Sequence, residues 1–224
     1  MDISNGQLTA YHSTLDLKPG LLAINSNFSK NFKNNLNSQR NRALKQKITF
    51  AVETHDLAIS EFHNLLAKQH LRYHKMLFQP LGLFQEFINL NIAKIYTARS
   101  SGTLIGGIYV LFDSNTAYYG WGARDTNASL GVHTLLINML IENSIMLEMH
   151  EVDFGLTAID DKDLLQYKLK WGVNTNSVFT YSTANSSPIV DLHSGFLITR
   201  NIYSRLPLTL AKIITPKILR TLIH

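Results

Sequence analysis

The most constraining feature of the sequence is a run of three short segments with the composition of β-strands, the first of which alternates in side-chain polarity. These segments are residues 93–99, 103–112 and 116–121. They are rich in β-branched and aromatic residues, and the breaks between them, Ser101-Gly102 and residues 113–115, hold turn-forming residues. Consecutive strands joined by such short turns must be antiparallel, because a parallel connection needs a dozen or more residues. The chain therefore builds three antiparallel strands in succession.

Periodicity in the rest of the chain predicts further elements around these strands. We expect strands at 47–53, 151–154 and 178–181, and helices at 28–46, 56–74, 83–90, 130–147 and 163–171. From the strand at 47–53 onward the order is β-α-α-β-β-β-α-β-α-β, which predicts an α/β protein with a mixed central sheet flanked by helices. We expect an N-terminal lead-in at 1–27, one domain at 28–184, and a basic amphipathic C-terminal tail at 185–224.

The formal net charge of +5 is distributed unevenly along the chain. Residues 1–50 carry seven basic and two acidic side chains, residues 51–180 carry nine and thirteen, and residues 181–224 carry five and one. Basic ends around a mildly acidic body predict contact with phosphates, nucleic acid or an anionic membrane surface. The alternative is solvated charge that keeps the protein in solution.

The absence of cysteine excludes disulfides, thiolate metal ligands and a cysteine nucleophile, and it fits a reducing compartment. The first ten residues lack the basic and apolar regions of a secretory signal. No stretch of the sequence reaches the roughly 18 apolar residues of a membrane span. We therefore expect a cytoplasmic protein, with peripheral contact at the inner membrane as an extension of that expectation.

Several common motifs are missing or incomplete. Residues 119–125, YGWGARD, begin like a dinucleotide-binding G-x-G-x-x-G loop, but Asp125 holds the third glycine position after an antiparallel strand. The glycines instead predict a β-bulge or a close approach to the backbone, with a plain strand end as the alternative. His63, His70 and His74 share one helix face without the Glu of a H-E-x-x-H site, so we expect no metal there. Nucleophile-elbow hydrolases and P-loop NTPases are excluded by the absence of their motifs.

Residues 150–172, HEVDFGLTAIDDKDLLQYKLKWG, hold the densest set of candidate site residues. A short strand delivers Asp153 to an end of the sheet, Gly155 releases the chain into a polar loop, and a helix carries Tyr167 and Lys168. A lysine in this position can stabilise a developing oxyanion or hold a phosphate. The alternative, which spacing alone favours, is a surface lysine above a packed aromatic pair.

The same stretch resembles a motif of FemAB-like proteins, a family of acyl- and aminoacyltransferases built on the GNAT fold. D-F-G at 153–155 and Q-Y-K-L-K-W-G at 166–172 are similar to their D-F-G…F-K-x-x-x-G signature. Three more segments agree in order: R-N-R-A-L-K at 40–45, Q-H-L-R-Y-H-K at 69–75, and the basic tail at 203–222. The resemblance spans residues 28–222 and implies a GNAT-like acyl-CoA N-acyltransferase fold.

The resemblance implies transfer of an acetyl, acyl or aminoacyl group to an amine of a cell-envelope, polysaccharide or peptidoglycan precursor, either small or lipid-linked. Lys168 is then the catalytic residue, which stabilises charge on the acyl-transfer intermediate or on a phosphate. The implied substrate-binding residues are Arg72, Tyr119, Trp121, Asp153, Gly155 and Tyr167. Ser129 and Gly131 are the expected donor-binding residues, because a helix N-terminus offers free N–H groups to a pyrophosphate.

Three departures from the family pattern leave alternatives open. Tyr167 replaces the usual Phe, residues 127–132 replace the R/Q-x-x-G-x-G/A loop, and one GNAT domain stands where the family usually has two. The donor is therefore acyl-CoA (acetyl-CoA) or an aminoacyl-tRNA, and nucleic acid is a partner only in the second case. The alternative to an enzyme is a non-catalytic half-protein that pairs with a separate GNAT domain or a second copy. Residues 200–224 mix apolar and basic side chains, which predicts docking on a domain or peripheral membrane contact.

Overall fold

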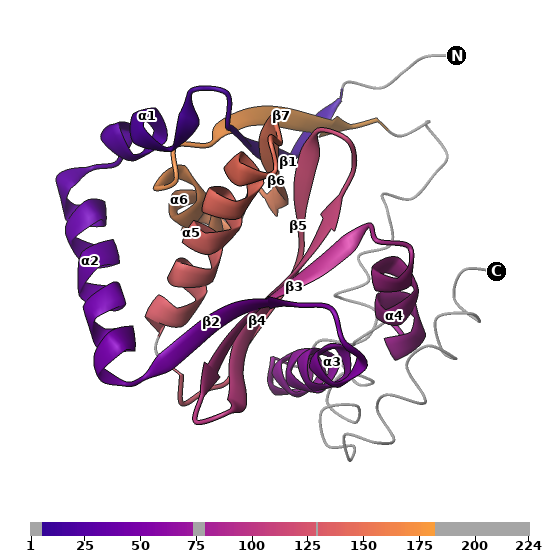
Figure 1. The fold of residues 1–224 in the computed structure, drawn as a ribbon. Coiled ribbons are helices and arrows are strands. Elements are labelled where there is room, and N and C mark those ends of the chain that lie inside the picture. Colours follow the sequence, from indigo (N-terminus) through magenta and orange to yellow (C-terminus); the bar gives the residue numbers. More distant parts are fainter. Residues whose placement is uncertain (1–5, 74–78, 129, 182–224) are drawn as a thin grey trace.

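A computed structural model describes residues 6–73, 79–128 and 130–181 of the 224-residue chain. The elements in chain order are β1 (Gln7–Asp16), α1 (Gly20–Asn27), α2 (Lys30–Lys45), β2 (Ile48–Glu53), α3 (Asp56–Arg72), α4 (Leu81–Asn89), β3 (Ala93–Ser100), β4 (Thr103–Phe112), β5 (Thr116–Arg124), α5 (Leu130–Met146), β6 (Glu151–Ala158), α6 (Lys162–Leu169) and β7 (Asn174–Thr180). The strands form one sheet with helices on both sides (Figure 1).

The order of strands across the sheet is β2-β3-β4-β5-β6-β1-β7. Neighbouring strands are antiparallel, except β5 and β6, which run parallel. The sheet is therefore mixed, and helices flank both of its faces. This confirms the fold class predicted from the sequence, including three successive antiparallel strands (β3, β4 and β5) followed by a helical crossover.

Every helix and strand predicted between residues 28 and 181 is present, with ends that shift by a few residues. The elements that the sequence pattern did not reveal lie earlier, because β1 and α1 occupy the segment described as an N-terminal lead-in. β1 lies inside the sheet and pairs with both β6 and β7. Its alternation was hard to recognise, since only Ser13 and Leu15 are buried along its length.

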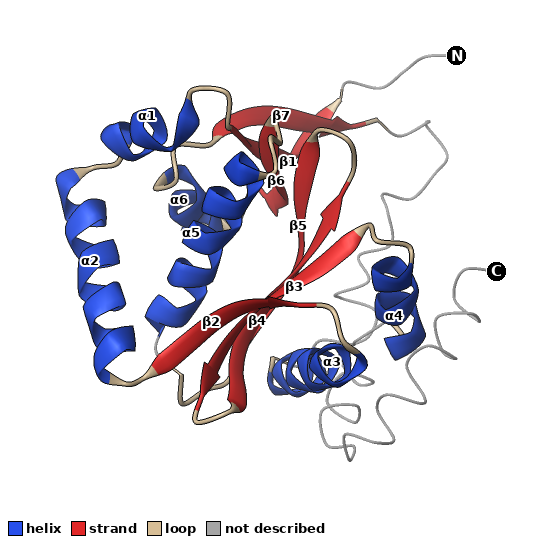
Figure 2. Cartoon of the chain, in the orientation of Figure 1, coloured by secondary structure: helices blue, strands red, loops and turns tan. Residues whose placement is uncertain are grey.

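One face of the sheet is covered by α1, α2, α5 and α6 (Figure 2). The helix predicted to be apolar on all sides, α5, lies in this layer with Leu136 and Leu140 fully buried. Trp171, just beyond α6, is also fully buried and makes edge contacts with the rings of Phe28 and Phe32. These contacts tie the ends of α1 and α6 together, so the layer is continuous from the first helix to the last.

The opposite face is covered by α3 and α4 over strands β3, β4 and β5 (Figure 1). Phe84 of α4 is the centre of an aromatic cluster, with ring centroids 4.8 Å from Tyr109, 5.0 Å from Trp121 and 6.1 Å from Phe62. The Tyr109 hydroxyl donates a 2.7 Å hydrogen bond to the Phe84 carbonyl oxygen. The polar end of this buried tyrosine is therefore satisfied inside the cluster.

Candidate active site at the fork of the sheet

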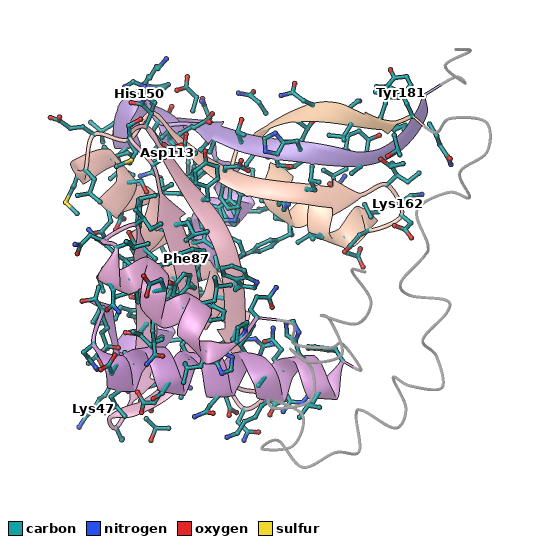
Figure 3. All side chains as sticks on the ribbon, turned by 90° about the vertical axis from the view of Figure 1, so that its right-hand side faces the viewer. Lys47, Phe87, Asp113, His150, Lys162 and Tyr181 are labelled. Atoms are coloured by element: carbon teal, nitrogen blue, oxygen red, sulfur yellow. The ribbon has the colours of Figure 1, made fainter. Side chains whose placement is uncertain are left out.

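The two parallel strands of the sheet stay together only at their first residues. Thr116–Tyr118 of β5 pair with Glu151–Asp153 of β6. Beyond these residues β5 continues along β4 and β6 continues along β1, so the sheet divides at a fork. We call β2–β5 the first arm and β6, β1 and β7 the second arm. Figure 3 views both arms from the side, with Lys162 at the start of α6 and Tyr181 just after β7 near the second arm, and Phe87 of α4 over the first.

A β-bulge on β5 coincides with the beginning of the fork. Tyr109 of β4 pairs with Trp121, whereas the next residue, Val110, pairs with Tyr119, so Gly120 is the extra residue. A bulge bends and twists its strand, and this one lies immediately after the last residue that pairs with β6. The bulge predicted at these glycines is confirmed.

A cavity of about 390 Å³ opens along the unpaired edge of β5. It is lined by Gln69, Tyr73, Tyr119, Gly122, Ala123, Arg124, His133, Thr134 and Tyr167. These residues come from α3 on one face of the sheet, from α5 and α6 on the other face, and from β5 between them. The cavity therefore connects the two faces of the sheet through the fork, and we call it the fork cavity.

Tyr119 and His133 form a hydrogen-bonded pair inside this cavity. The Tyr119 hydroxyl oxygen lies 3.0 Å from His133 Nε2. Burial, helped by the positive charge of Arg124, lowers the pKa of His133 to about 4, so the imidazole is neutral at pH 7. Burial also raises the pKa of Tyr119, so its phenol stays protonated. The pair thus offers neutral hydrogen-bond donors and acceptors, and no fixed charge, to a molecule in the cavity.

Tyr167 of α6 stands where the cavity meets a second one. The Tyr167 and Thr134 hydroxyl oxygens lie 3.4 Å apart, and both residues also line a cavity of about 290 Å³ beside α2. Burial raises the pKa of Tyr167, although its hydrogen bond with Thr134 acts in the opposite direction. Tyr167, like Tyr119, is therefore a protonated phenol in the cavity, and the sequence predicted both as site residues.

Gln69 of α3 binds the free edge of β5 at the same place. Its Nε2 donates to the Gly122 carbonyl oxygen at 3.1 Å, and the Arg124 backbone N–H donates to its Oε1 at 2.9 Å. The side-chain amide thus replaces the strand that the fork removes from β5. Sequence reasoning missed Gln69 and also His133, although a histidine in an otherwise apolar helix was a signal that could have been followed.

The D-F-G motif forms a second bulge, on β6. His12 pairs with Leu156 and Thr14 with Asp153, so Phe154 and Gly155 lie opposite the single residue between them on β1. Gly155 has a φ of +69°, a left-handed conformation that glycine adopts without a steric penalty. Its N–H donates a 2.6 Å hydrogen bond to Asp153 Oδ1. The motif therefore specifies a bulge that fixes the aspartate side chain.

Lys168 holds this bulge from the side of α6. Its Nζ donates to the carbonyl oxygens of Gly155 at 3.0 Å and Leu156 at 3.2 Å, and the residue is only 5% exposed. Burial lowers the pKa of Lys168, while the charges of Asp153 and Asp161 act in the opposite direction. Lys168, Asp153 and Gly155 therefore lie together as predicted, but the ammonium group contacts backbone and is not among the residues that line the fork cavity.

The other predicted site residues lie apart from the cavity. Arg72 Nη2 donates to Thr126 Oγ1 at 3.0 Å, which places it beside the loop before α5. Trp121 packs in the aromatic cluster under α4. At Gly131 a Cβ would overlap the Gln39 side chain, so this glycine allows close packing of α2 on α5. Ser129 lies outside the described residues, as does the tail at 185–224 with its predicted membrane contact at 200–224.

Arg124 braces the same loop from the end of β5. Its Nη1 donates to the carbonyl oxygens of Ala128 at 2.7 Å and of Asp125 at 3.4 Å. The loop is also closed by the Asn127 N–H, which donates to Asp125 Oδ1 at 2.9 Å. The guanidinium groups of Arg124 and Arg72 thus both contact the segment that leads into α5.

Two structural features bear on metal and membrane binding. In residues 6–73, 79–128 and 130–181, no three His, Cys, Asp or Glu side chains gather where they could hold a metal ion. His63 is buried with its Nε2 3.0 Å from the Gln79 carbonyl oxygen, and His74 lies outside the described residues. Within that described part of the chain, every helix falls short of the length or apolar character that crossing a membrane requires.

Residues 30–169, more than half of the chain, match the model of a family described as the acetyltransferase (GNAT) domain. The chain belongs to this family. The GNAT resemblance predicted from the sequence is thereby confirmed. A search of curated protein sequences gave no match. Strands β1 and β7 lie outside the matched residues, although they complete the sheet.

Solved structures with the same fold include three larger proteins. L-PGS from Bacillus licheniformis is 14% identical with a TM-score of 0.61, and the match covers 88% of this chain and 66% of that one. The C-terminal domain of a putative lysylphosphatidylglycerol synthetase from Agrobacterium fabrum is 12% identical, with a TM-score of 0.59 and coverage of 77% and 59%. FemX is 13% identical, with a TM-score of 0.61 and coverage of 74% and 59%. This GNAT chain thus spans 59 to 66% of the length of these proteins.

Proposed function

We propose that this GNAT-family chain is an N-acyltransferase, and that the acyl donor and the amine acceptor meet in the fork cavity. The observation that carries the proposal is the Tyr119–His133 pair, two neutral groups 3.0 Å apart in a cavity that reaches both faces of the sheet. Family membership supports the reaction class, and the two-sided cavity supports the approach of two reactants from opposite directions.

The phenols provide a way to stabilise the transition state. When the amine nitrogen attacks the acyl carbonyl carbon, negative charge develops on the carbonyl oxygen. Neutral His133 donates from Nε2 to the Tyr119 oxygen, and the Tyr119 hydrogen is then available to that oxyanion. Tyr167, the second protonated phenol, donates to the group that leaves as the carbon–nitrogen bond forms. Because neither phenol carries charge before the reaction, both act as donors that are already in place.

Lys168 has a positioning role in this proposal. The resemblance implied direct stabilisation of charge by its ammonium group, but two of its three hydrogens are already donated to the Gly155 and Leu156 carbonyls. We propose that Lys168 acts by holding the D-F-G bulge, and through it Asp153, at the fork. Its removal should therefore reduce turnover less than removal of the Tyr119 hydroxyl.

The donor is proposed to carry phosphate, as both acyl-CoA and aminoacyl-tRNA do. Arg72 and Arg124 brace the loop before α5, where Ser129 and Gly131 were predicted as donor-binding residues. Guanidinium groups beside a helix N-terminus favour phosphate. The acceptor is proposed to be an amine of a cell-envelope, polysaccharide or peptidoglycan precursor, on the basis of the FemAB-like D-F-G and Q-Y-K segments. The cytoplasmic location, with peripheral contact at the inner membrane, remains part of this proposal.

A transfer assay tests the function. The purified chain is incubated with labelled acetyl-CoA, longer acyl-CoAs or charged tRNA and with a panel of amines, and acylated product is quantified. Loss of one oxyanion donor in Tyr119→Phe should lower kcat by about 10²-fold or more. The matched control is Tyr118→Phe, whose hydroxyl bonds to Asp113 at 2.7 Å outside the cavity and should leave kcat unchanged. No product with any donor, or equal kcat for both variants, would contradict the proposal.

The second candidate is the non-catalytic half-protein. It is favoured by one observation, that the chain spans only 59 to 66% of the length of the matched proteins. In this case a separate GNAT domain completes the site, or a second copy of the chain does. Light scattering of the purified protein, combined with the transfer assay, decides between the two. A monomer with turnover supports the enzyme, whereas an inactive chain that gains turnover with a copurified GNAT partner supports the half-protein.

A further inference from the structure

His12 of β1 and Asp153 of β6 form a close pair on the second arm. His12 Nε2 lies 2.9 Å from both carboxylate oxygens of Asp153. The His12 side chain is 35% exposed and that of Asp153 is 14% exposed. Ion pairs with such access to water contribute only about 0–1 kcal/mol to stability. A contribution to stability therefore does not by itself explain why the two side chains lie so close together.

Several contacts fix the carboxylate in its orientation. Asp153 Oδ1 accepts the Gly155 N–H at 2.6 Å, and Lys168 holds the carbonyls that the bulge releases. The bulge also reverses the alternation of β6, so that Leu156 is exposed while Thr157 is buried. Asp153 is therefore aimed by the backbone and receives His12 as an additional partner.

The pair has the chemistry of a general base. With Nε2 directed at a carboxylate, the neutral imidazole carries its hydrogen on Nε2 and a lone pair on Nδ1. A carboxylate in this position also stabilises the imidazolium that forms when Nδ1 takes a proton. Among the described residues no hydrogen-bond partner of His12 Nδ1 is present, and the side chain is open to solvent. In a serine-protease triad Nδ1 faces the carboxylate and Nε2 takes the proton, whereas here the two nitrogens exchange these roles. In both cases the carboxylate orients the imidazole that accepts the proton.

The pair lies at the point where the fork begins. Asp153 pairs with Tyr118, the last residue of β5 that contacts β6 in register. The next residue, Tyr119, is the first β5 residue that lines the cavity. His12 and Asp153 are not among the residues that line the cavity, so the inference requires the acceptor amine to lie between the pair and Tyr119.

The titratable groups around the pair come from two further elements. Lys168 of α6 and Tyr118 of β5 both respond to the charge of Asp153, which acts to raise the pKa of each. On β7, Asn176 lies opposite His12 and carries no charge.

We propose that His12, oriented by Asp153, accepts the proton of the acceptor amine in the acyl transfer. This inference rests on the function proposed above. The nitrogen lone pair forms the new bond to the acyl carbon, one N–H proton passes to His12 Nδ1, and the donor's leaving group departs with the electron pair of the broken bond and a proton from Tyr167. Tyr167 then regains a proton from water. The resulting imidazolium returns its proton to water. His12 is the catalytic residue of the pair, and Asp153 is its positioning residue.

The test is the pH dependence of kcat/KM for His12→Ala and Asp153→Asn. Loss of a general base lowers the rate by about 10²–10⁴-fold, and the acidic limb of the wild-type profile should disappear in His12→Ala. Added imidazole should restore part of the His12→Ala rate and none of the Asp153→Asn rate. Asp153→Asn is nearly isosteric and keeps an oxygen for the Gly155 N–H, so it reports on the base even if His12→Ala proves unstable.

His55→Ala is the matched control. His55 Nε2 also contacts a carboxylate, Glu53 at 3.3 Å, and its Nδ1 accepts the Ala58 N–H at the start of α3. This variant should lose stability but keep the wild-type pH profile. Wild-type turnover together with an unchanged profile in both His12→Ala and Asp153→Asn would overturn this inference alone. Absence of turnover in the wild-type protein would overturn the proposed function, and this inference with it.

Discussion

The two arms that meet at the fork differ in how their faces are covered. The first arm is packed on both faces, by α2 and α5 on one side and by α3 and α4 on the other. On the second arm, Leu156 is 61% exposed and His12 is 35% exposed. The first arm is therefore packed on both faces, whereas the second arm leaves His12 open to solvent, where our proposal has it meet a reactant. The fork, at the boundary between the arms, lies next to both the packed first arm and the more open second arm.

The ion pairs of the two arms show the same difference. In the first arm, Arg99 Nη2 lies 3.0 Å from Glu53 and 2.6 Å from Glu61, which links β3, β2 and α3 with side chains no more than 31% exposed. Burial acts to raise the pKa of Glu53, but hydrogen bonds from Thr97 and Arg99 and the Arg99 charge outweigh it and hold that pKa below its usual value. In the second arm, Asp153 is the one ion-pair partner of His12 among the residues that the structure describes. We therefore expect the first network to stabilise the fold and the second pair to contribute little.

The largest effect on stability is expected from the aromatic cluster of the first arm. Phe84 is fully buried among four rings, so Phe84→Ala should lower the free energy of unfolding by about 3–5 kcal/mol. Leu156→Ala on the second arm should change it by less than about 0.5 kcal/mol. Guanidinium denaturation of both variants measures the difference. Equal losses would show that the arms do not differ as the structure implies.

The next largest effect concerns the fork itself and depends on pH. His133 has a folded pKa of about 4, below its usual value of 6.5, so the unfolded chain binds more protons between these values. Stability should therefore fall as pH decreases from 6.5 to 4, by about 2–3 kcal/mol from this residue. Denaturation at a series of pH values shows whether His133→Asn flattens that part of the curve. A slope identical to wild type would mean that the imidazole is not held neutral in the cavity.

An intermediate effect is expected when the first arm's ion pairs are broken. Arg99→Met leaves the Glu53 and Glu61 carboxylates without their shared partner and should lower the free energy of unfolding by about 2 kcal/mol. Asp153→Asn is the corresponding change on the second arm, and it should lower the free energy of unfolding by less than about 1 kcal/mol. Thermal unfolding at neutral pH compares the two variants directly. A larger loss in Asp153→Asn would assign a structural role to the His12 pair.

A smaller effect than that of Arg99→Met is expected when Lys168 is removed from the D-F-G bulge. Lys168→Met keeps most of the side-chain volume and removes two hydrogen bonds to backbone carbonyls. This change should lower the free energy of unfolding by about 1–2 kcal/mol. Hydrogen exchange should then increase at β6 and leave β3 and β4 unchanged. If exchange stays slow at β6, Lys168 does not hold the bulge, and the direct catalytic role implied by the family resemblance becomes the better account.

The sequence predicted more of the first arm than of the second, for a physical reason. β3 and β4 are rich in β-branched and aromatic residues and are bounded by turn-forming residues, so each strand is evident from local pattern alone. β1 is mostly half-buried, and its place between β6 and β7 depends on pairings across most of the chain. Local pattern carries no information on such pairings, and for this reason the segment was not recognised as a strand.

The candidate site divides in the same way. Tyr119, Asp153, Gly155, Tyr167 and Lys168 were found because they lie in motifs or at strand ends. The partners that complete the site come from other elements, and these partners are His12, Gln69 and His133. His12 and Asp153 are separated by 141 residues, so only the strand order brings them together. A motif identifies one side of a contact, and the fold supplies the other.

The most direct test of the central claim is turnover by Gly122→Ala. A Cβ at Gly122 would overlap the Tyr119 hydroxyl and lie 2.7 Å from His133 Cε1, so the pair must shift within the cavity. Displacement of about 1 Å in a catalytic group can cost about 10²-fold in rate, and we predict a loss of this size with little change in stability. Gly82→Ala, where a Cβ meets nothing within 4 Å, is the control and should keep wild-type turnover. Wild-type turnover in Gly122→Ala would contradict the claim that acyl transfer takes place in the fork cavity.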